Sequence, residues 1–422
     1  MEPYFVPTSL LVDTIDYVDQ FSELPNQKPS AKAGVADAET YQTATPSFLV
    51  SKYGIVEATK AVAGSTSATV QFAPNWYSAA DLQTFFTKFV PAMEGQKVAS
   101  TFGVNGKAPT STPAKPSVES NLDQQYIMGI GNFVESSIYY VVDPSSGIEE
   151  GFVDYATFIN NQATFPYVQS ISYGQYGGQY TNATVQRLTS ELQMATTRGY
   201  SGLLASGDNG VGAKCSGSSC VSFEFDFPSS PMLTMVGATQ FLASNGAETG
   251  ATLSAGGFSA DYYRPSWQAN AVNAYLNSGV SMPSPSLYAS SGRGYPDIAA
   301  VGQNVELIVN GAPTFVGGTS CSAPITAGIF ALLNNYRISN GKSPPRMAQP
   351  LHLPEPPRLQ GHHRRQQQVL PDLRLLLLWL QRRPWLGPRH WPRLSQLSQS
   401  SQRCQVSELK QKEDIFWKER LG

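Results

Sequence analysis

A short segment, Gly317-Gly318-Thr319-Ser320, precedes an apolar stretch that includes residues 325–337. The two glycines allow a sharp turn and a close backbone approach, and Pro324 is a residue that the first turn of a helix tolerates. Because the stretch is apolar on nearly every side, it predicts a buried helix with Ser320 at its N-terminus. Amide N–H groups and the helix dipole favour developing negative charge there, which suits a nucleophilic serine. The alternative is a Ser/Thr cap on a core helix.

Histidine is missing from the first 345 residues; the four in the chain are His352, His362, His363 and His390. If Ser320 is a nucleophile, this distribution argues against an imidazole base and against a Ser-His-Asp triad. A carboxylate is the next candidate for the base. Unless its pKa is raised, a carboxylate base works at acidic pH.

A pair of acidic residues, Glu119 and Asp123, lies in a segment that Ser117 would cap as a helix. At a spacing of i and i+4 both carboxylates share one helix face, and their mutual repulsion should raise the pKa of one of them. This is a means of making a base or an acid from a carboxyl group. The alternative is a solvated acidic face. Function is favoured by the apolar side chains around the pair, which are Leu122, Tyr126, Ile127 and Met128.

Further polar residues follow segments that read as buried strands, residues 137–142, 168–173 and 201–206. With a helix predicted over residues 181–198, the alternation of strands and helices indicates a parallel α/β sheet, whose chemistry belongs at the carboxyl ends of its strands. Ser172-Tyr173-Gly174 and Asp208 lie at such ends. Asp208 is either a turn aspartate or a donor to an oxyanion, and a carboxyl donates only when it is protonated.

Several other elements must position these residues. Thr45 and Pro46 predict a helix start, Ser78 caps a helix with a stripe of Leu82, Phe85, Phe86 and Phe89, and residues 98–104 read as a strand. A short helical element over residues 3–21 precedes a segment, residues 22–46, that reads either as an activation segment or as a plain connector.

Composition narrows the class of protein. With 422 residues the chain can bury one large core or two ordinary ones. The stretch from Arg346 holds 14 Lys/Arg against 6 Asp/Glu, so the remainder is acidic. An acidic, lysine-poor body argues against nucleic-acid binding and fits a secreted protein adapted to low pH. The sequence shows neither a membrane-spanning stretch nor a signal peptide.

Two sites depend on an oxidising, secretory compartment. Cys215 and Cys220 could close a small disulfide, the alternative being two free thiols. Asn182-Ala183-Thr184 is a glycosylation sequon. Neither a further cysteine pair nor a histidine stands near Cys215 to make a zinc site.

Four motifs, in this order, resemble those of the sedolisins, acid-acting serine-carboxyl peptidases with a subtilisin-like fold, and most of all the fungal tripeptidyl-peptidase branch. The similarity runs from about Thr45 to Pro345. The motifs are Glu119-Ser120-Asn121-Leu122-Asp123, Ser206-Gly207-Asp208-Asn209-Gly210, Ser254-Ala255-Gly256-Gly257-Phe258-Ser259 and Gly318-Thr319-Ser320-Cys321-Ser322-Ala323-Pro324.

The resemblance implies a role for each candidate residue. Ser320 would be the nucleophile and Glu119 its general base and acid. Asp123 would orient Glu119, and Asp208 would stabilise the oxyanion. Ser172, Tyr173 and Gly174 would lie along the substrate cleft. It also implies calcium, held by a loop after the serine helix, but no such ligand loop is found in this chain, and no metal ligands are assigned.

We therefore predict an α/β subtilisin-like fold in which a parallel β-sheet is flanked by helices. Residues 1–41 would be a prodomain remnant and linker, residues 42–345 the catalytic domain, and residues 346–422 an aberrant, disordered tail unrelated to the family. The predicted function is hydrolysis of peptide bonds at acidic pH through an acyl-enzyme on Ser320, releasing tripeptides from the N-termini of peptides. The alternative is an inactive remnant that lacks the calcium site. We expect a secreted monomer that acts on peptides or unfolded proteins.

Overall fold

The computed structural model describes residues 32–34, 40–72, 76–104, 116–141, 147–176, 181–210, 213–216, 219–223, 226–277, 279, 282 and 284–343. The predicted tail, residues 346–422, and most of residues 1–41 lie outside this part, so the predicted domain boundaries stay predictions. Within residues 1–41, Lys32–Gly34 form strand β1, and Tyr41 makes a β-bridge to Leu242.

An eight-stranded sheet forms the centre, in the order β12-β11-β7-β5-β2-β4-β3, with β15 also paired to β11. Seven strands are parallel, and β12 is antiparallel to β11. The strands are β2 (Thr66–Phe72), β3 (Thr101–Val104), β4 (Glu135–Val141), β5 (Val168–Ile171), β7 (Ser201–Ala205), β11 (Thr234–Phe241), β12 (Glu248–Gly250) and β15 (Ile298–Val301). The predicted α/β fold with a parallel sheet flanked by helices is confirmed.

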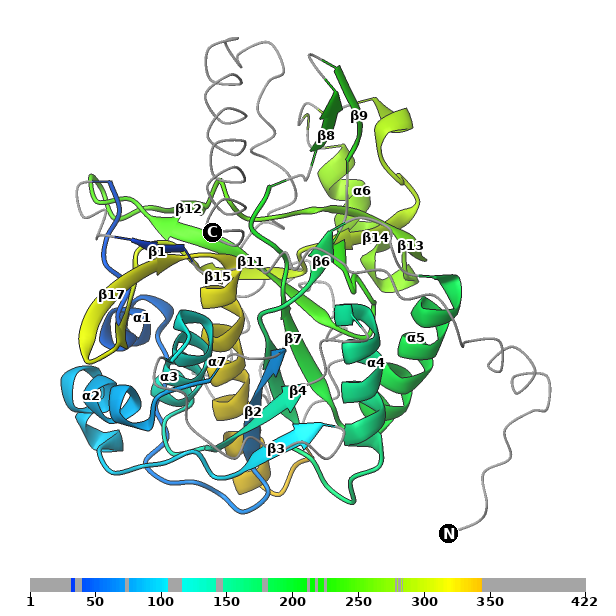
Figure 1. The fold of residues 1–422 in the computed structure, drawn as a ribbon. Coiled ribbons are helices and arrows are strands. Elements are labelled where there is room, and N and C mark those ends of the chain that lie inside the picture. Colours follow the sequence, from blue (N-terminus) through cyan, green and yellow to red (C-terminus); the bar gives the residue numbers. More distant parts are fainter. Residues whose placement is uncertain are drawn as a thin grey trace, which may run out of the picture. The chain divides into compact units, whose positions relative to one another are not determined.

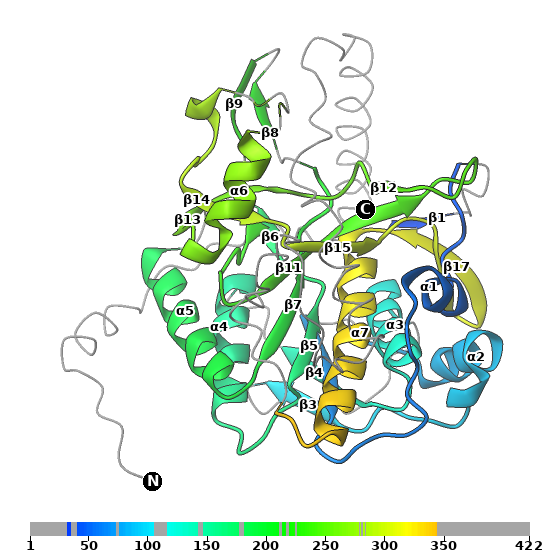
Figure 2. The same ribbon diagram turned by 180° about the vertical axis from the view of Figure 1, so that it is seen from behind.

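Helices cover both faces of this sheet. Helices α3 and α7 lie side by side on one face, and α4 and α5 lie on the other (Figures 1 and 2). The helices are α1 (Pro46–Tyr53), α2 (Ala79–Phe89), α3 (Val118–Gly131), α4 (Gly147–Asn160), α5 (Asn182–Thr197), α6 (Ala269–Leu276) and α7 (Thr319–Ser339), with short 3₁₀ turns η2 (Pro91–Met93), η4 (Ser266–Gln268) and η5 (Pro285–Leu287).

Small sheets complete the described part of the chain. Antiparallel strands β1, β17 and β16 form a three-stranded sheet, and the others are two-stranded pairs. These strands are β16 (Val305–Val309), β17 (Ala312–Gly317), β6 (Gln175–Tyr176), β10 (Asp226–Phe227), β8 (Ala213–Ser216), β9 (Ser219–Phe223), β13 (Gly257–Tyr263) and β14 (Gly292–Tyr295). Strand β17 leads directly into α7.

The predicted helix starts are confirmed by side-chain caps. Thr45, Ser78, Ser117 and Thr181 each accept a hydrogen bond from the backbone N–H three residues on, which satisfies a first-turn donor. The predicted strand over residues 98–104 is shorter and begins at Thr101.

Strand β2 shows why the core has two parts. Its residues Ala68, Val70 and Phe72 face the apolar cluster beneath α4 and α5. The alternate positions Thr69 and Gln71 are polar but fully buried, and they face α3. At β2, therefore, one face of the sheet joins an apolar cluster and the other carries buried polar side chains that bond to α3. Elsewhere this second face is also apolar, because Val168, Leu203 and Val236 belong to the cluster that includes α3 and α7.

Candidate active site

Ser320 is the second residue of α7, the helix that follows Gly318. Its side chain is fully buried, and its Oγ has no hydrogen-bond partner within the described part of the chain. A buried hydroxyl usually makes a hydrogen bond, because leaving it unpaired costs about 1–3 kcal/mol. An unpaired hydroxyl at a helix N-terminus is chemically available, as a nucleophile must be.

Asp208 is joined to the residue before the serine. Its Oδ1 accepts hydrogen bonds from the backbone N–H of Thr319 at 2.6 Å and from the Thr319 hydroxyl at 2.8 Å. Its Oδ2 would lie 2.8 Å from a Cβ atom on Gly318, so a side chain at this position would force the carboxylate to move. The glycine before the threonine is thus explained by the close approach of a carboxylate, and Asp208 lies beside the N-terminus of α7.

The loop that carries Asp208 is bonded to a second loop, residues 253–256. The Ser206 hydroxyl donates to the carbonyl of Ala255 at 2.8 Å, and the Ala255 N–H donates to the carbonyl of Gly207 at 2.8 Å. The Gly210 N–H also donates to the carbonyl of Leu253 at 3.0 Å. The Ser254–Ser259 motif, for which the residues alone suggested no chemistry, thus helps to hold the Asp208 loop.

Asp123 lies deep in the structure, at zero exposure. Its Oδ2 accepts a hydrogen bond from Gln71 Nε2 and its Oδ1 one from Ser172 Oγ, both at 2.7 Å. Burial raises the pKa of Asp123 to about 7, while the two hydrogen bonds act in the opposite direction. A raised pKa in the acidic pair was predicted from charge repulsion, but the main cause is burial.

Gln71 and Tyr173 extend this network. The Tyr173 hydroxyl donates to Gln71 Oε1 at 2.8 Å, which fixes the amide so that its nitrogen faces Asp123. Gln71 was not predicted as a site residue, since glutamine within an alternating strand reads as solvent-exposed. The side chains of Ser172 and Tyr173 are buried and directed at the acidic network, whereas Gly174 is partly exposed.

Pro324 lies inside α7 rather than in its first turn, which corrects the sequence-based expectation: the helix already begins at Thr319. A proline has no N–H, so the carbonyl of Ser320, four residues earlier, receives no helical hydrogen bond. The hydroxyl of Ser172 lies 3.3 Å from this carbonyl oxygen and shares its proton between it and Asp123. One hydroxyl therefore joins the acidic pair to the serine's own backbone.

The thiol of Cys321, the residue after the serine, interacts electrostatically with three acidic side chains. Burial raises the pKa of its thiol well above the usual range, and the charges of Glu119, Asp208 and Asp123 raise it further. Glu119 is itself largely buried, at 8% exposure. Asp208 bonds Thr319, and Ser172 links Asp123 to the Ser320 carbonyl, so these two carboxyl groups lie near the N-terminus of α7. The charge of Glu119 acts on the thiol of Cys321, next to Ser320 in the chain.

Known proteins are similar to this chain in fold and in sequence. The structure of Pseudomonas sedolisin, a serine-carboxyl proteinase, superimposes with a TM-score of 0.52 at 22% identity, covering 72% of this chain and 83% of that one. Tripeptidyl-peptidase 1 of Rattus norvegicus is 32% identical over 355 residues, and that of Homo sapiens is 32% identical over 356. In sequence and in fold, the chain is therefore similar to members of the sedolisin family. The alignments cover 81% of the chain but only 61% of either relative, and no family model matches it.

The α/β fold is therefore the subtilisin-like fold that sedolisins share. In the described residues, no group of three or more His, Cys, Asp or Glu side chains could hold a metal ion. The calcium that the resemblance implies was expected in a loop after the serine helix, and the residues after Ser343 lie outside the described part, so this expectation stays untested and we assign calcium no ligands. The described part of the chain contains no helix that is long and apolar enough to span a membrane.

Two predicted modification sites lie away from the serine helix. Asn182 is exposed at the first position of α5, where Thr181 caps the helix. Cys215 and Cys220 lie directly opposite each other in the β8–β9 pair, but their side chains are outside the described part. Glycosylation and the disulfide remain predictions for this chain.

Proposed function

We propose that this chain is a serine-carboxyl peptidase that cleaves peptide bonds at acidic pH and releases tripeptides from the N-termini of its substrates. The observation that carries the proposal is a buried serine hydroxyl with no partner in the described residues, on a helix whose N-terminus bonds Asp208 and is linked through Ser172 to Asp123. The charge of Glu119 acts on the adjacent Cys321. The similarity to sedolisins supports the reaction class. The tripeptide product is the activity named for the relatives, of which this chain spans about three fifths.

In the proposed reaction, Ser320 Oγ attacks the carbonyl carbon of the scissile bond, and Glu119 takes the hydroxyl proton. Glu119 then gives this proton to the leaving amine as the C–N bond breaks, which leaves an acyl-enzyme. Water, deprotonated by Glu119, then attacks the ester; Glu119 returns this proton to Ser320 Oγ as the bond between the acyl carbon and Oγ breaks, which releases the peptide acid. The carboxyl proton of Asp208, present in acid, would donate to the oxygen that becomes negative in each step.

Asp123 supplies a proton rather than a second charge in this scheme. Because its pKa is raised to about 7, it is protonated at acidic pH. A neutral acid beside Glu119 can donate a hydrogen bond to the ionised base and avoids the repulsion between two carboxylates. Gln71 and Ser172 hold the Asp123 carboxyl in place from both sides.

The decisive experiment compares two serines of the same helix. Ser320→Ala should abolish release of a tripeptide from a fluorogenic tripeptide amide at about pH 4, because the acyl-enzyme cannot form. It should cost little stability, since this hydroxyl has no partner in the described part of the chain. Ser322→Ala is the matched control: its hydroxyl donates to the carbonyls of Ala300 and Val301, so it should lose stability and keep turnover.

The outcomes separate the competing functions. Turnover that survives Ser320→Ala would remove the proposed nucleophile. A wild-type chain that is folded but inactive, with and without added calcium, would instead support the inactive remnant. An N-acetylated version of the substrate tests the exopeptidase part, since a tripeptidyl-peptidase must recognise the free amino group.

A further inference from the structure

Helix α3 carries polar side chains on the side opposite to its two acids. Asn121 and Gln125 are each two residues beyond Glu119 and Asp123, a rotation of about 200° around the helix. Gln125 is fully buried and bonds Ile308 of β16 on both sides: its Nε2 donates to the Ile308 carbonyl at 2.7 Å, and the Ile308 N–H donates to its Oε1 at 2.9 Å. The Gln125 amide thus makes the two hydrogen bonds to the backbone of Ile308 that a neighbouring strand would otherwise make.

A second set of bonds holds the turn of the same hairpin. Asn121 Nδ2 donates to Asp81 Oδ2 at 2.8 Å. Asp81 in turn accepts the backbone N–H groups of Asn310, at 2.9 Å, and Gly311, at 2.7 Å. All three side chains, Asp81, Asn121 and Gln125, are buried. We call these three residues the amide clamp.

The hairpin held by the amide clamp is the one that delivers the serine. Strand β16 pairs with β17 along its whole length, from Val305 opposite Val316 to Val309 opposite Ala312. Strand β17 ends at Gly317, and α7 begins two residues later with Thr319. One face of α3 therefore holds the strand that leads to Ser320, while its other face presents Glu119.

The C-terminal end of α3 contacts the middle of α7 at two glycines. A Cβ atom on Gly328 of α7 would lie 2.7 Å from Ile130 Cβ and 2.9 Å from the nitrogen of Gly131, so the helices touch there. Glu119 lies twelve residues before Gly131, a distance of about 18 Å along α3 at 1.5 Å per residue. A tilt of about 5° at this contact would move Glu119 by roughly 1.5 Å.

We propose that the amide clamp, and Gln125 above all, is a positioning device that sets the distance between Glu119 and Ser320. The inference rests on the proposed function. The glycine contact holds the C-terminal end of α3 against α7. The amide clamp holds the part of α3 that is nearer to Glu119. A misplacement of about 1 Å can cost about 10²-fold in rate, so the bonds from Gln125 act through the geometry of two groups that it does not touch.

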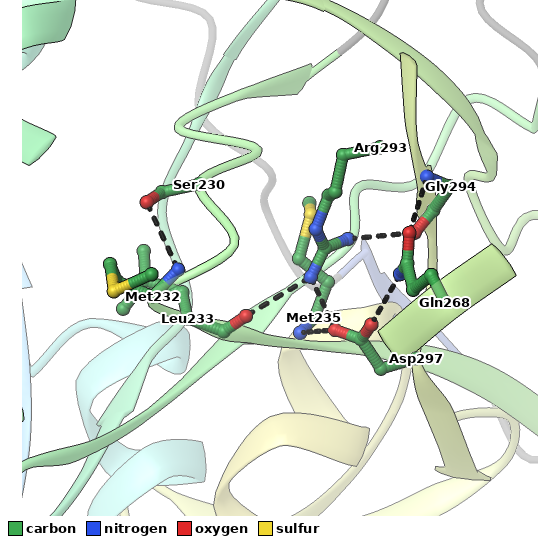
Figure 3. A network of polar contacts seen from close by, with 8 residues as sticks. All are labelled: Ser230, Met232, Leu233, Met235, Gln268, Arg293, Gly294 and Asp297. Carbon is green, nitrogen blue, oxygen red and sulfur yellow. Dashed lines mark hydrogen bonds and ion pairs between the residues drawn. The ribbon is translucent and has the colours of Figure 1, made fainter. Parts of the chain in front are cut away.

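A matched control exists elsewhere in the molecule. Gln268, at the end of η4, bonds Gly294 of β14 in the same two-sided way: Nε2 to the carbonyl at 2.7 Å, and the Gly294 N–H to Oε1 at 3.0 Å. Figure 3 shows this amide with Asp297, to which it also donates, and with the buried guanidinium of Arg293. A substitution that removes the Gln268 amide breaks the same kind of bonds to a backbone N–H and C=O, but these bonds do not hold the β16–β17 hairpin.

The test compares Gln125→Met with Gln268→Met in the full chain. Both should lower the urea midpoint of unfolding, because each leaves a backbone N–H unpaired and removes the shorter of two bonds to a backbone C=O, which keeps only its bond from Asn121 or Arg293. Well below that midpoint, Gln125→Met should lose about 10²-fold in kcat with little change in KM, whereas Gln268→Met should stay within about twofold of wild type. Equal kcat values for the two variants would overturn the proposal.

A second variant remains informative if Gln125→Met does not fold. Gln125→Glu can donate to the Ile308 carbonyl only when the new carboxyl is protonated. Its kcat, relative to wild type, should therefore recover as the pH falls, while Gln268→Glu should follow the wild-type profile. A pH-independent ratio for Gln125→Glu would contradict the proposal.

Failure of the proposed function would be recognised separately, by wild-type activity that does not depend on Ser320. The distance between the Glu119 carboxyl and Ser320 Oγ is then measured without an activity assay, in crystal structures of wild type and Gln125→Met. An unchanged separation of the Glu119 carboxyl and Ser320 Oγ would overturn the inference, and a separation increased by about 1 Å or more would support it.

Discussion

Pro324 leaves the carbonyl oxygen of Ser320 without a helical hydrogen bond. The Ser172 hydroxyl lies 3.3 Å from this oxygen and 2.7 Å from Asp123 Oδ1. A single proton thus serves both acceptors and links the serine's backbone to Asp123. The proline makes the carbonyl of the candidate nucleophile sensitive to the charge on Asp123.

Replacing the proline should change that sharing. In Pro324→Ala the new N–H can bond the Ser320 carbonyl, so Ser172 donates to Asp123 alone. Because the Ser172 bond lowers the pKa of Asp123, this pKa should fall. The measurement is a carbon-13 titration of the Asp123 carboxyl, complemented by the pH profile of kcat.

Ser172→Ala is the opposing variant. It removes the donor from Asp123, so the pKa should rise above that of wild type, and the loss of a buried hydrogen bond should cost about 1–3 kcal/mol. Shifts of the same sign in Pro324→Ala and Ser172→Ala would show that the proton is not shared. Ser170→Ala, at a buried serine of β5 two residues earlier, should leave the pKa of Asp123 unchanged.

Gly318→Ala should displace Asp208. The new methyl group would lie 2.8 Å from Asp208 Oδ2, which is closer than real contacts allow. We expect a loss of about 1–3 kcal/mol in the free energy of unfolding, from overpacking, and a fall in kcat of about 10²-fold from the moved carboxyl. The measurements are urea unfolding and tripeptide release.

A double-mutant cycle identifies the cause of this loss. In an Asp208→Ala background the methyl group of Gly318→Ala meets no carboxylate, so its cost in unfolding free energy should largely disappear. Equal costs in both backgrounds would mean that the clash with Asp208 is not the reason. Gly257→Ala, whose methyl group would lie 3.5 Å from the Tyr295 hydroxyl, is the control for a glycine with ordinary space.

Asp123 should make the protein more stable in acid than near neutrality. Its pKa is about 7 in the folded chain, against the ordinary value of 3.8, so between these values the folded state holds a proton that the unfolded state has released. This group therefore lowers the free energy of unfolding by up to about 1.4 kcal/mol per pH unit as the pH rises from 3.8 to 7. Its contribution is constant below that window.

Asp123→Asn removes this dependence. Urea unfolding from pH 4 to pH 7 should give a flatter curve for the variant than for wild type, and the two should differ most near pH 7, where the variant is relatively more stable. Parallel curves would show that Asp123 ionises normally in the folded protein. Activity should fall in the same variant, because an amide cannot supply a carboxyl proton to Glu119.

Gln71→Glu should raise the pKa of Asp123 further. The substitution removes an N–H donor that lowers this pKa and places a second carboxyl 2.7 Å from Asp123 Oδ2, the position of the present Gln71 nitrogen. The predicted result is a higher midpoint on the alkaline side of the pH profile for kcat/KM. Gln169→Glu is the control, because Gln169 is equally buried and also accepts a tyrosine hydroxyl, from Tyr155. A matching shift in both variants would argue against a local effect on Asp123.

The sequence predicted the helices and the candidate acids well, because caps and apolar periodicity are local signals. Ser117, Thr45 and Ser78 mark helix starts whatever packs against them. Gln71 and Gln125 were not predicted, because their roles depend on partners that are distant in the sequence. The sequence around a glutamine does not show whether the side chain faces a carboxylate, as Gln71 does, or a backbone carbonyl, as Gln125 does. Pro324 was placed too near the helix start, because a freed carbonyl can be satisfied by a residue 148 positions away.

Strand β1 has a practical consequence for handling the protein. Lys32–Gly34 pair with Phe315–Gly317, covering one side of β17 up to the residue before Gly318. A version shortened to begin after Gly34 would leave β17 as a bare edge, with backbone groups ready to join another molecule's strand. Such a product should self-associate as it is concentrated, so crystallisation or storage is better attempted with residues 32–34 retained.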